Sequence, residues 1–442
     1  MMNQTQNDAR ILTTPLLQDA ASLENQNSSQ ADEAASISGA VFNISTTMIG
    51  AGIMSVPATI KVLGILPGFL SILAVAFFTD VTVEFLLRYT QSGKSITYAG
   101  IVAESFGACG SVAVQICVMI TNLGCLIIYL IMIGDVLCGS QSGETLHLGI
   151  LQQLFGIHWW NSRAYALLFI VLFIMLPLVL PKRVDSLRHT SAISILLAVL
   201  FVVISSAMAI HALWEGKTQK LRIFPDFSKV SVFDLFTIVP VLVTGFGIQV
   251  NVHPIRAELG KPADMSLAAR ISLAISVAIY FAIGFFGYLL FGDSIMPDML
   301  VNFDQNSDTK IGKILNIIVR LAYAIHLLLV FPIMNFSLRA NIDELIFPNK
   351  PILASDTPRF VFLTCVLLAV AYTVAIAIPN IWYFFQFMGS TTIVCLSFIF
   401  PGAIILRDVH GISTTRDKIM AILVILLAVV TSTITISNNL HG

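Results

Sequence analysis

The stretch FNISTTMIGAGI, residues 42–53, and the stretch VTGFGIQ, residues 243–249, each place Gly-x-Gly-Ile inside a long apolar segment. Each is followed by a proline, at Pro57 and Pro254. Glycine lets a backbone unwind and approach its neighbours closely, and proline removes a backbone donor. The two stretches therefore predict two membrane-spanning helices that are broken near their middles.

The composition places the whole chain in a membrane. Of its 442 residues, 57% are hydrophobic and 11% are charged, whereas about a quarter of a soluble chain is charged. The apolar residues fall in runs of about 20, the length of a helix that crosses the hydrocarbon layer. Such runs are too long and too uniform for barrel strands, so we predict an all-α polytopic membrane protein.

About 11 transmembrane helices are expected. They lie near 37–60, 65–87, 109–137, 164–181, 188–214, 235–254, 268–291, 312–338, 359–378, 381–405 and 418–437. Residues 1–36 are polar and predict a disordered tail before the transmembrane domain, 37–437. Most Lys and Arg residues outside the spans fall on the side of this tail, which indicates a cytosolic N-terminus.

The two interrupted segments open two five-helix halves, 37–214 and 235–405, and 418–437 is then an extra helix. Interrupted segments at corresponding positions of two halves point to a transporter site. Freed N–H groups at a half-helix attract a carboxylate, and freed carbonyl groups accept an ammonium group. An α-amino acid carries both charges. The alternative is that each Gly-x-Gly is only a face for close helix packing.

The first stretch resembles the opening helix of the amino acid/auxin permease family, through Phe42, Asn43, Ser45, Gly50, Gly52 and Ile53. Weaker matches are Pro254, Ile255, Glu258 and Leu259 after the sixth span, and Arg320, Leu321 and Ala322 in the eighth. Within the family the chain looks most like the plant vacuolar amino acid transporters, which are similar to the sodium-coupled neutral amino acid transporters. The resemblance implies a LeuT-like fold of two inverted five-helix repeats, with substrate held between broken helices 1 and 6.

This interpretation assigns a substrate site. We expect the backbone of Gly50, Ala51, Gly52 and Ile53 to hold the carboxylate. Thr46 and the backbone around Gly245 and Gly247 would face the amino group, and Phe246 would cap the side-chain pocket. With few cations at depth, a neutral amino acid is the expected substrate.

Departures from the family pattern bear on the coupling ion. Two positions that help to hold sodium in the sodium-coupled branch align with Thr46 and with Leu328 or Val330, so two side-chain donors are missing. The family's histidine of the sixth span aligns with Gln249. His326 lies midway along the eighth span, and an ionisable residue inside a membrane is a functional candidate. We therefore expect proton coupling through His326; the alternative is a neutral histidine hydrogen-bonded within the bundle.

Asp80, Glu84 and Arg88 follow one another at intervals of four near the end of the second span. They are candidates for a gate or proton path, although an ion-pair ladder along one helix is the simpler interpretation.

The sequence thus predicts a proton-coupled secondary transporter of amino acids in a vacuolar or other internal membrane, with the plasma membrane as the alternative. Two other functions stay open: a sodium-coupled transporter, and an amino acid sensor that signals through a partner. No enzyme motif is present. No cofactor, metal or nucleic acid is expected, and the partners are the amino acid, protons and the lipid bilayer.

Overall fold

The computed structural model describes residues 36–142, 145–182, 188–218, 220–228, 230–303, 310–347, 350–351 and 353–441. The predicted tail, 1–36, lies outside these residues except for Ser36. The chain is nearly all helical, and its short hairpin β1–β2 pairs Ser140–Ser142 with Thr145–His147. The α-helical elements in chain order are α2 (Ile37–Met48), α3 (Val56–Leu63), α4 (Ile65–Ser92), α5 (Tyr98–Cys138), α6 (Ile150–Phe155), α7 (Arg163–Ile170), α8 (Leu176–Leu178), α9 (Arg188–Trp214), α10 (Val232–Gly245), α11 (Gln249–Glu258), α12 (Met265–Phe291), α13 (Met299–Asn302), α14 (Lys310–Ile346), α15 (Thr357–Ala377), α16 (Ile381–Ser390), α17 (Thr392–Val394), α18 (Phe400–Arg407) and α19 (Thr415–His441).

Shorter 3-10 and π segments join several of these helices. They are η1 (Ala51–Ser55), η2 (Trp159–Asn161), η3 (Val171–Met175), η5 (Pro262–Asp264), η6 (Gly292–Ser294), η7 (Leu353–Ser355) and η8 (Cys395–Ile399). In the described chain, 9 helices are long and apolar enough to cross a membrane, and the bent pair Ile37–Met48 and Ala51–Leu63 raises this to 10. The shorter apolar helix Arg163–Leu178 occupies the place of the predicted fourth span.

The first span is broken where the sequence predicts it. α2 ends at Met48, and the chain passes Ile49 and Gly50 before η1 and α3 continue at an angle of 45°. The sixth span is interrupted between the end of α10 at Gly245 and the start of α11 at Gln249, without a bend as large as that of the first span.

The two breaks touch. A Cβ atom placed on Gly52 would lie 2.9 Å from the Cα atom of Gly245, and one placed on Gly245 would lie 2.8 Å from the Tyr280 hydroxyl oxygen. Atoms at such distances would have to move, so glycine at Gly52 lets the two backbones approach, and glycine at Gly245 leaves room for the Tyr280 ring. The contact between the two broken helices therefore explains why glycine occurs in both Gly-x-Gly stretches.

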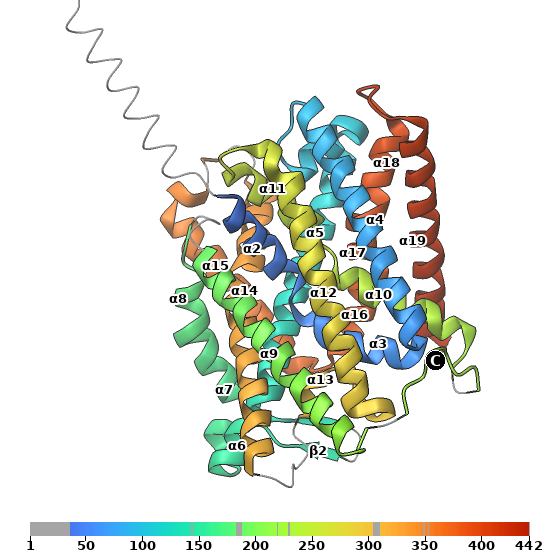
Figure 1. Ribbon diagram of the computed structural model, residues 1–442. Coiled ribbons are helices and arrows are strands. Elements are labelled where there is room, and N and C mark those ends of the chain that lie inside the picture. The colour runs from blue at the N-terminus through green and yellow to red at the C-terminus, as the bar shows by residue number, and fades with distance from the viewer. Residues whose placement is uncertain are drawn as a thin grey trace, which may run out of the picture.

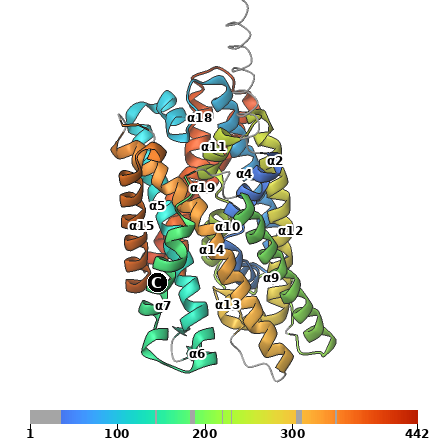
Figure 2. The same cartoon turned by 90° about the vertical axis from the view of Figure 1, so that its left-hand side faces the viewer.

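The remaining spans form two groups. α12 packs on α2, α3 and α4, and α10 packs on α3 and α4. α5 packs on α14, α15 and α7. α9 lies between the groups and contacts α2, α12 and α14, as the two views of Figures 1 and 2 show.

We name the two ends of the bundle by their structure. The tail side carries the start of α2, the end of α11 and the α18–α19 connection, at the top of Figure 1. The hairpin side carries β2 and α6, at the bottom of the same view.

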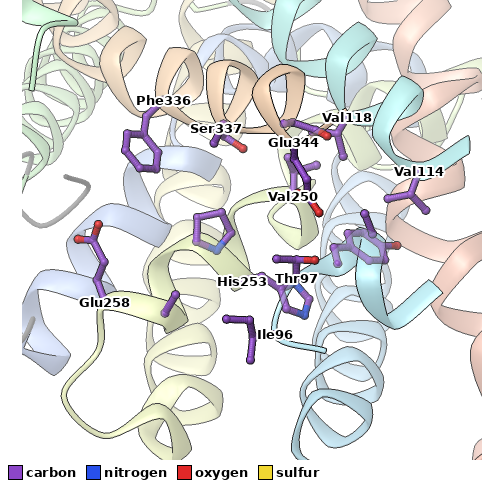
Figure 3. A pocket seen from close by; sticks show the side chains of 16 residues that line it. Ile96, Thr97, Val114, Val118, Val250, His253, Glu258, Phe336, Ser337 and Glu344 are labelled. Atoms are coloured by element: carbon purple, nitrogen blue, oxygen red, sulfur yellow. The ribbon is translucent and has the colours of Figure 1, made fainter. Parts of the chain in front are cut away.

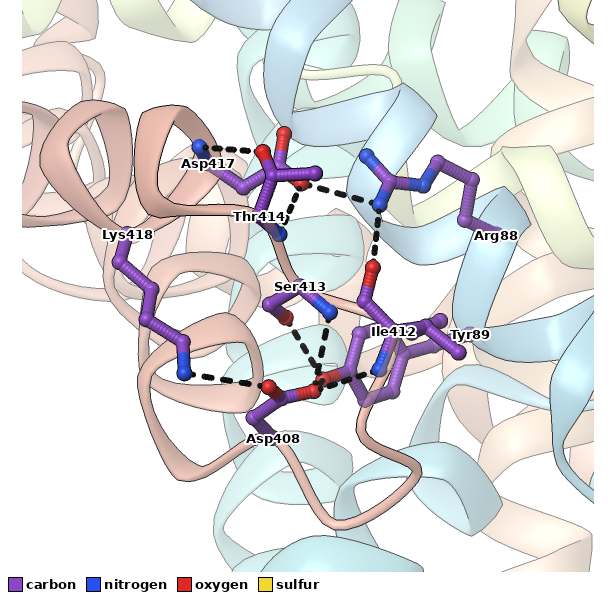
Figure 4. A network of polar contacts seen from close by, with 8 residues as sticks. All are labelled: Arg88, Tyr89, Asp408, Ile412, Ser413, Thr414, Asp417 and Lys418. Atoms are coloured by element: carbon purple, nitrogen blue, oxygen red, sulfur yellow. Dashed lines mark hydrogen bonds and ion pairs between the residues drawn. The ribbon is translucent and has the colours of Figure 1, made fainter.

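α19, the predicted extra helix, is held to the bundle on the tail side by a polar network (Figure 4). The Asp408 carboxylate accepts hydrogen bonds from the Tyr89 hydroxyl at 2.9 Å and from the backbone N–H groups of Ile412 and Ser413. Lys418 lies 3.2 Å from the same carboxylate, and Arg88 pairs with Asp417 at 3.0 Å. This network joins α4 to both α18 and α19.

Candidate functional site

A small cavity of about 30 Å³ lies at the two breaks, in the middle of the bundle. Its walls come from both broken helices and from α5, α14 and the α16–α17 region. The lining residues are Thr47, Met48, Gly50, Ala51, Gly52, Thr121, Asn122, Cys125, Ile128, Tyr129, Thr244, Gly245, Gly247, Asn251, Met334, Phe385 and Ile393.

The lining offers hydrogen-bonding groups without any charged side chain. The side-chain nitrogen of Asn122 is buried and has no hydrogen-bond partner among the described residues. Thr121 instead donates to Thr392 at 2.8 Å. Burying a polar group without a partner costs free energy. The Asn122 nitrogen is therefore a candidate donor to a group that enters the cavity.

Three side chains bind the carbonyl groups that the breaks release. The hydroxyl of Tyr280 lies 2.7 Å from the Met48 carbonyl oxygen and 2.9 Å from that of Gly245, so it bridges the two broken helices. Tyr323 donates to the Gly50 carbonyl oxygen at 2.6 Å. His326 Nε2 lies 2.5 Å from the Ile49 carbonyl oxygen. Unwound backbone at this depth is tolerated because side chains replace its helical partners.

The second nitrogen of His326 has two partners on one residue of α9. Its Nδ1 lies 2.8 Å from Ser194 Oγ and 2.8 Å from the Ser194 carbonyl oxygen. A neutral ring is satisfied when Ser194 Oγ donates to Nδ1 and Nε2–H donates to Ile49. A protonated ring is satisfied when Nδ1–H donates to the Ser194 carbonyl oxygen instead. The site therefore accommodates both protonation states without moving the ring.

A larger cavity of about 430 Å³ opens on the tail side (Figure 3). Side chains of α11, α14 and the start of α5 surround it, among them His253, Glu258, Phe336 and Glu344. The small cavity lies one turn further along the same helices, where Asn251 of α11 contacts the Met334 sulfur at 3.5 Å. We call the larger cavity the vestibule; Asn251 and Met334 line the small cavity on the side that faces it.

The structure brings most of the predicted site residues together. Gly50, Ala51, Gly52, Gly245 and Gly247 line the small cavity. Three predicted residues do not: Thr46, Ile53 and Phe246. Thr46 donates to the Ser191 carbonyl oxygen on α9, while its neighbour Thr47 faces the cavity. Phe246 is fully buried with its ring 4.9 Å from that of Tyr280.

Sequence reasoning missed the contribution of α5, which includes Thr121, Asn122 and Tyr129. The signal was present, since a threonine and an asparagine stand side by side within a long apolar run. Asn251, one turn before Pro254, was also missed. Within the described chain, no group of three His, Cys, Asp or Glu residues is arranged to hold a metal ion.

The predicted gate residues have partners on other helices. Arg270 of α12 lies 3.2 Å from Asp80 and 3.4 Å from Glu84, so both acids join α4 to α12. Glu84 also accepts from Ser266 at 2.7 Å. Arg88 turns the other way, to Asp417 of α19. These residues therefore form bridges between helices in addition to their spacing along α4.

Comparison with known proteins supplies the family. Residues 33–438 match the sequence profile of the family described as "Transmembrane amino acid transporter protein". The chain is 56% identical to "Amino acid transporter AVT6C" of Arabidopsis thaliana, over 94% of this chain and 96% of that one. It is 27% identical to "Vacuolar amino acid transporter 2" of Saccharomyces cerevisiae, over 90% and 81%.

Solved structures support the fold. A manganese transporter of Eremococcus coleocola superposes with a TM-score of 0.55 at 13% identity, over 91% of this chain and 86% of that one. MhsT, solved with L-phenylalanine, superposes with a TM-score of 0.53 at 14% identity, over 90% and 97%. Both have the LeuT fold, so the predicted fold class is confirmed.

Proposed function

Because the chain belongs to the transmembrane amino acid transporter protein family and is a multi-pass integral membrane protein, we propose that it carries neutral amino acids across a vacuolar or other internal membrane by proton-coupled secondary transport. The observation that carries the proposal is the position of His326, whose ring binds the Ile49 carbonyl oxygen at the break beside the small cavity.

The lining of the small cavity supports a neutral amino acid as substrate. An α-carboxylate matches the N–H groups that a broken helix frees, and the buried Asn122 nitrogen adds a further donor. A charged substrate side chain would need an opposite charge, and the lining contains none. The small size of the cavity fits a closed state that must expand around its substrate.

The contacts of His326 support protons as the coupling ion. A cation bound at the first break would use the oxygens of Ile49 and Ser194, and the imidazole already occupies both. Sodium needs several oxygen ligands, whereas a proton needs only the ring nitrogen. His326 joins α14 to α2 and α9 in either protonation state, so a proton on its ring would add a positive charge at the first break, beside the substrate site.

The two groups of helices support transport by alternating access. α2–α3, α4, α10–α11 and α12 would rock as one body against α5, α7, α14 and α15. The vestibule would then be the exit on the tail side, which the distribution of Lys and Arg assigns to the cytosol. An acidic compartment on the hairpin side would drive substrate toward the cytosol.

The test is uptake of a labelled amino acid panel into liposomes that contain the purified protein. An inward proton gradient is compared with an inward sodium gradient. We expect neutral amino acids to accumulate with the proton gradient alone. Uptake that follows only the sodium gradient would transfer the coupling role to sodium. Binding without uptake under either gradient would favour the sensor.

A further inference from the structure

A short buried helix lies on the hairpin side of the bundle. α13, the short helix Met299–Asn302, enters the bundle between α5 and η1. Met299, Leu300 and Phe303 are almost fully buried. We call residues 295–303 the plug, because they fill the hairpin side of the bundle next to the first break.

The plug reaches the first break through aromatic contacts. The ring of Phe303 lies 6.0 Å from that of Phe201, which lies 5.1 Å from that of Tyr323. Tyr323 in turn donates to the Gly50 carbonyl oxygen. Asn302 binds the Met296 N–H and the Ser294 carbonyl oxygen, which makes the plug one internally bonded unit. A continuous run of buried contacts therefore links the plug to the first break, beside the small cavity.

Asp298 is the buried acidic residue of the plug. It is 4% exposed, and its Oδ1 accepts from Leu300 N at 2.9 Å, which caps α13. Its Oδ2 is buried and has no hydrogen-bond partner among the described residues. It faces a cavity of about 10 Å³, roughly the space of one water molecule. An ionised carboxylate with one unsolvated oxygen is much less favourable there than a protonated one.

The charged neighbours of Asp298 are already engaged. Asp135 of α5 pairs with Arg163 of α7 at 2.5 Å. Arg320 of α14 donates to the backbone oxygens of Val136 and Leu148. His147 of β2 lines the same small cavity, and Lys61 of α3 binds the Ile295 carbonyl oxygen at 3.3 Å.

We propose that Asp298 is a proton-binding site on the hairpin side, and that its protonation closes the plug over the transport path. The proposal rests on the proposed function only in assigning the hairpin side to an acidic compartment. Asp298 would take up a proton when the plug closes. It would release the proton, and its carboxylate would be hydrated, when the plug withdraws.

The direction of the pH effect follows from linkage. Burial raises the pKa of Asp298 to about 7; the Leu300 N–H opposes this rise, Asp135 adds to it and Arg320 opposes it. In the withdrawn plug the pKa returns to about 3.9. The closed state, with the raised pKa, is therefore fully favoured below the lower value and loses this advantage as the pH rises through the higher one. Between about pH 8 and about pH 5.5, closure should become roughly thirtyfold more favourable.

The test is hydrogen–deuterium exchange of the plug amides in the purified full-length protein at these two pH values, corrected for intrinsic exchange rates. We expect protection of 295–303 to increase on acidification in the wild type. Asp298→Asn and Asp298→Ser keep a side-chain cap for Leu300 N without a titrating group, so their plugs should be protected equally at both pH values. Glu215→Gln, which removes a carboxylate from the end of α9 on the same side, should behave like the wild type.

Two results would overturn the proposal: pH-independent protection in the wild type, or a wild-type pH response in both Asp298 variants. Because exchange is measured without substrate or a gradient, a failure of proton-driven amino acid uptake would count against the proposed function and leave this test intact.

Discussion

Asn122 lines the small cavity with a buried amide nitrogen that is available to a ligand. It lies within the apolar run of α5 and is 1% exposed, yet its amide nitrogen has no partner among the described residues. The carbonyl groups of the broken helices, by contrast, are taken by Tyr280, Tyr323 and His326. The Asn122 nitrogen is therefore a free donor on α5, where we expect it to bind substrate.

We predict that Asn122→Ala raises the KM for the amino acid roughly tenfold. One hydrogen bond to a charged group contributes about 1.5–3 kcal/mol, and tenfold corresponds to about 1.4 kcal/mol. Initial uptake rates over a range of substrate concentrations measure it. Gln115→Ala is the control, because Gln115 is a buried polar residue of the same helix outside the cavity lining. An unchanged KM in Asn122→Ala would remove this residue from the substrate site.

At the scale of elements, the two broken helices act as one unit because their breaks are in contact. Gly52 and Gly245 bring the backbones together, and the Tyr280 hydroxyl bridges Met48 and Gly245. A shift of one break therefore shifts the other. The glycines matter for this contact rather than for a left-handed backbone, since neither has a positive φ angle.

We predict that Gly52→Ala abolishes uptake. Its new methyl group would lie 2.9 Å from the Gly245 Cα atom, which is backbone and cannot rotate away. Uptake and size-exclusion chromatography of the purified variant measure transport and folding separately. Gly68→Ala is the control, because the atom nearest to its new methyl group, at 3.1 Å, belongs to the Ile60 side chain, which can adjust. Normal uptake by Gly52→Ala would show that the breaks separate freely.

The attachment of α19 to the bundle depends on the charge of Asp408. Burial alone would raise the pKa of this carboxyl, but hydrogen bonds from Tyr89, Ser413 and Lys418 outweigh it and hold the pKa well below its usual range. A lowered pKa stabilises the folded state above the unfolded value of about 3.9, and this stabilisation is lost as the pH falls through the folded value.

We predict that Asp408→Asn lowers the free energy of unfolding by about 1–2 kcal/mol near neutral pH, because a charged acceptor becomes a neutral one. The difference from the wild type should shrink in strong acid. Thermal unfolding in detergent across a pH series measures it, with Asp264→Asn, at the start of α12 on the same side, as control. A difference that grows on acidification would contradict the role assigned to the ionised carboxylate.

At the scale of the whole molecule, the sequence predicts the architecture better than the site. Apolar runs and two Gly-x-Gly breaks are local signals, so the spans and the two broken helices follow directly from them. Which side of a broken helix faces the cavity is a tertiary property, and Thr47 rather than Thr46 lines it. Helical spacing pairs Glu84 with Arg88 on the same helix, whereas in the structure Glu84 forms an ion pair with Arg270 of α12.

His326 of α14 bears on the whole molecule, because its ring contacts both α9 and the break after α2. The most direct test of proton coupling uses His326→Gln in liposomes and compares two assays. Exchange of labelled for unlabelled amino acid needs no net proton movement, whereas accumulation under a proton gradient does. His211→Gln, an exposed histidine on α9, is the matched control.

We predict that His326→Gln retains exchange and loses proton-driven accumulation, while His211→Gln retains both. Accumulation by His326→Gln at the wild-type level would contradict proton coupling through this residue and return His326 to a purely structural role.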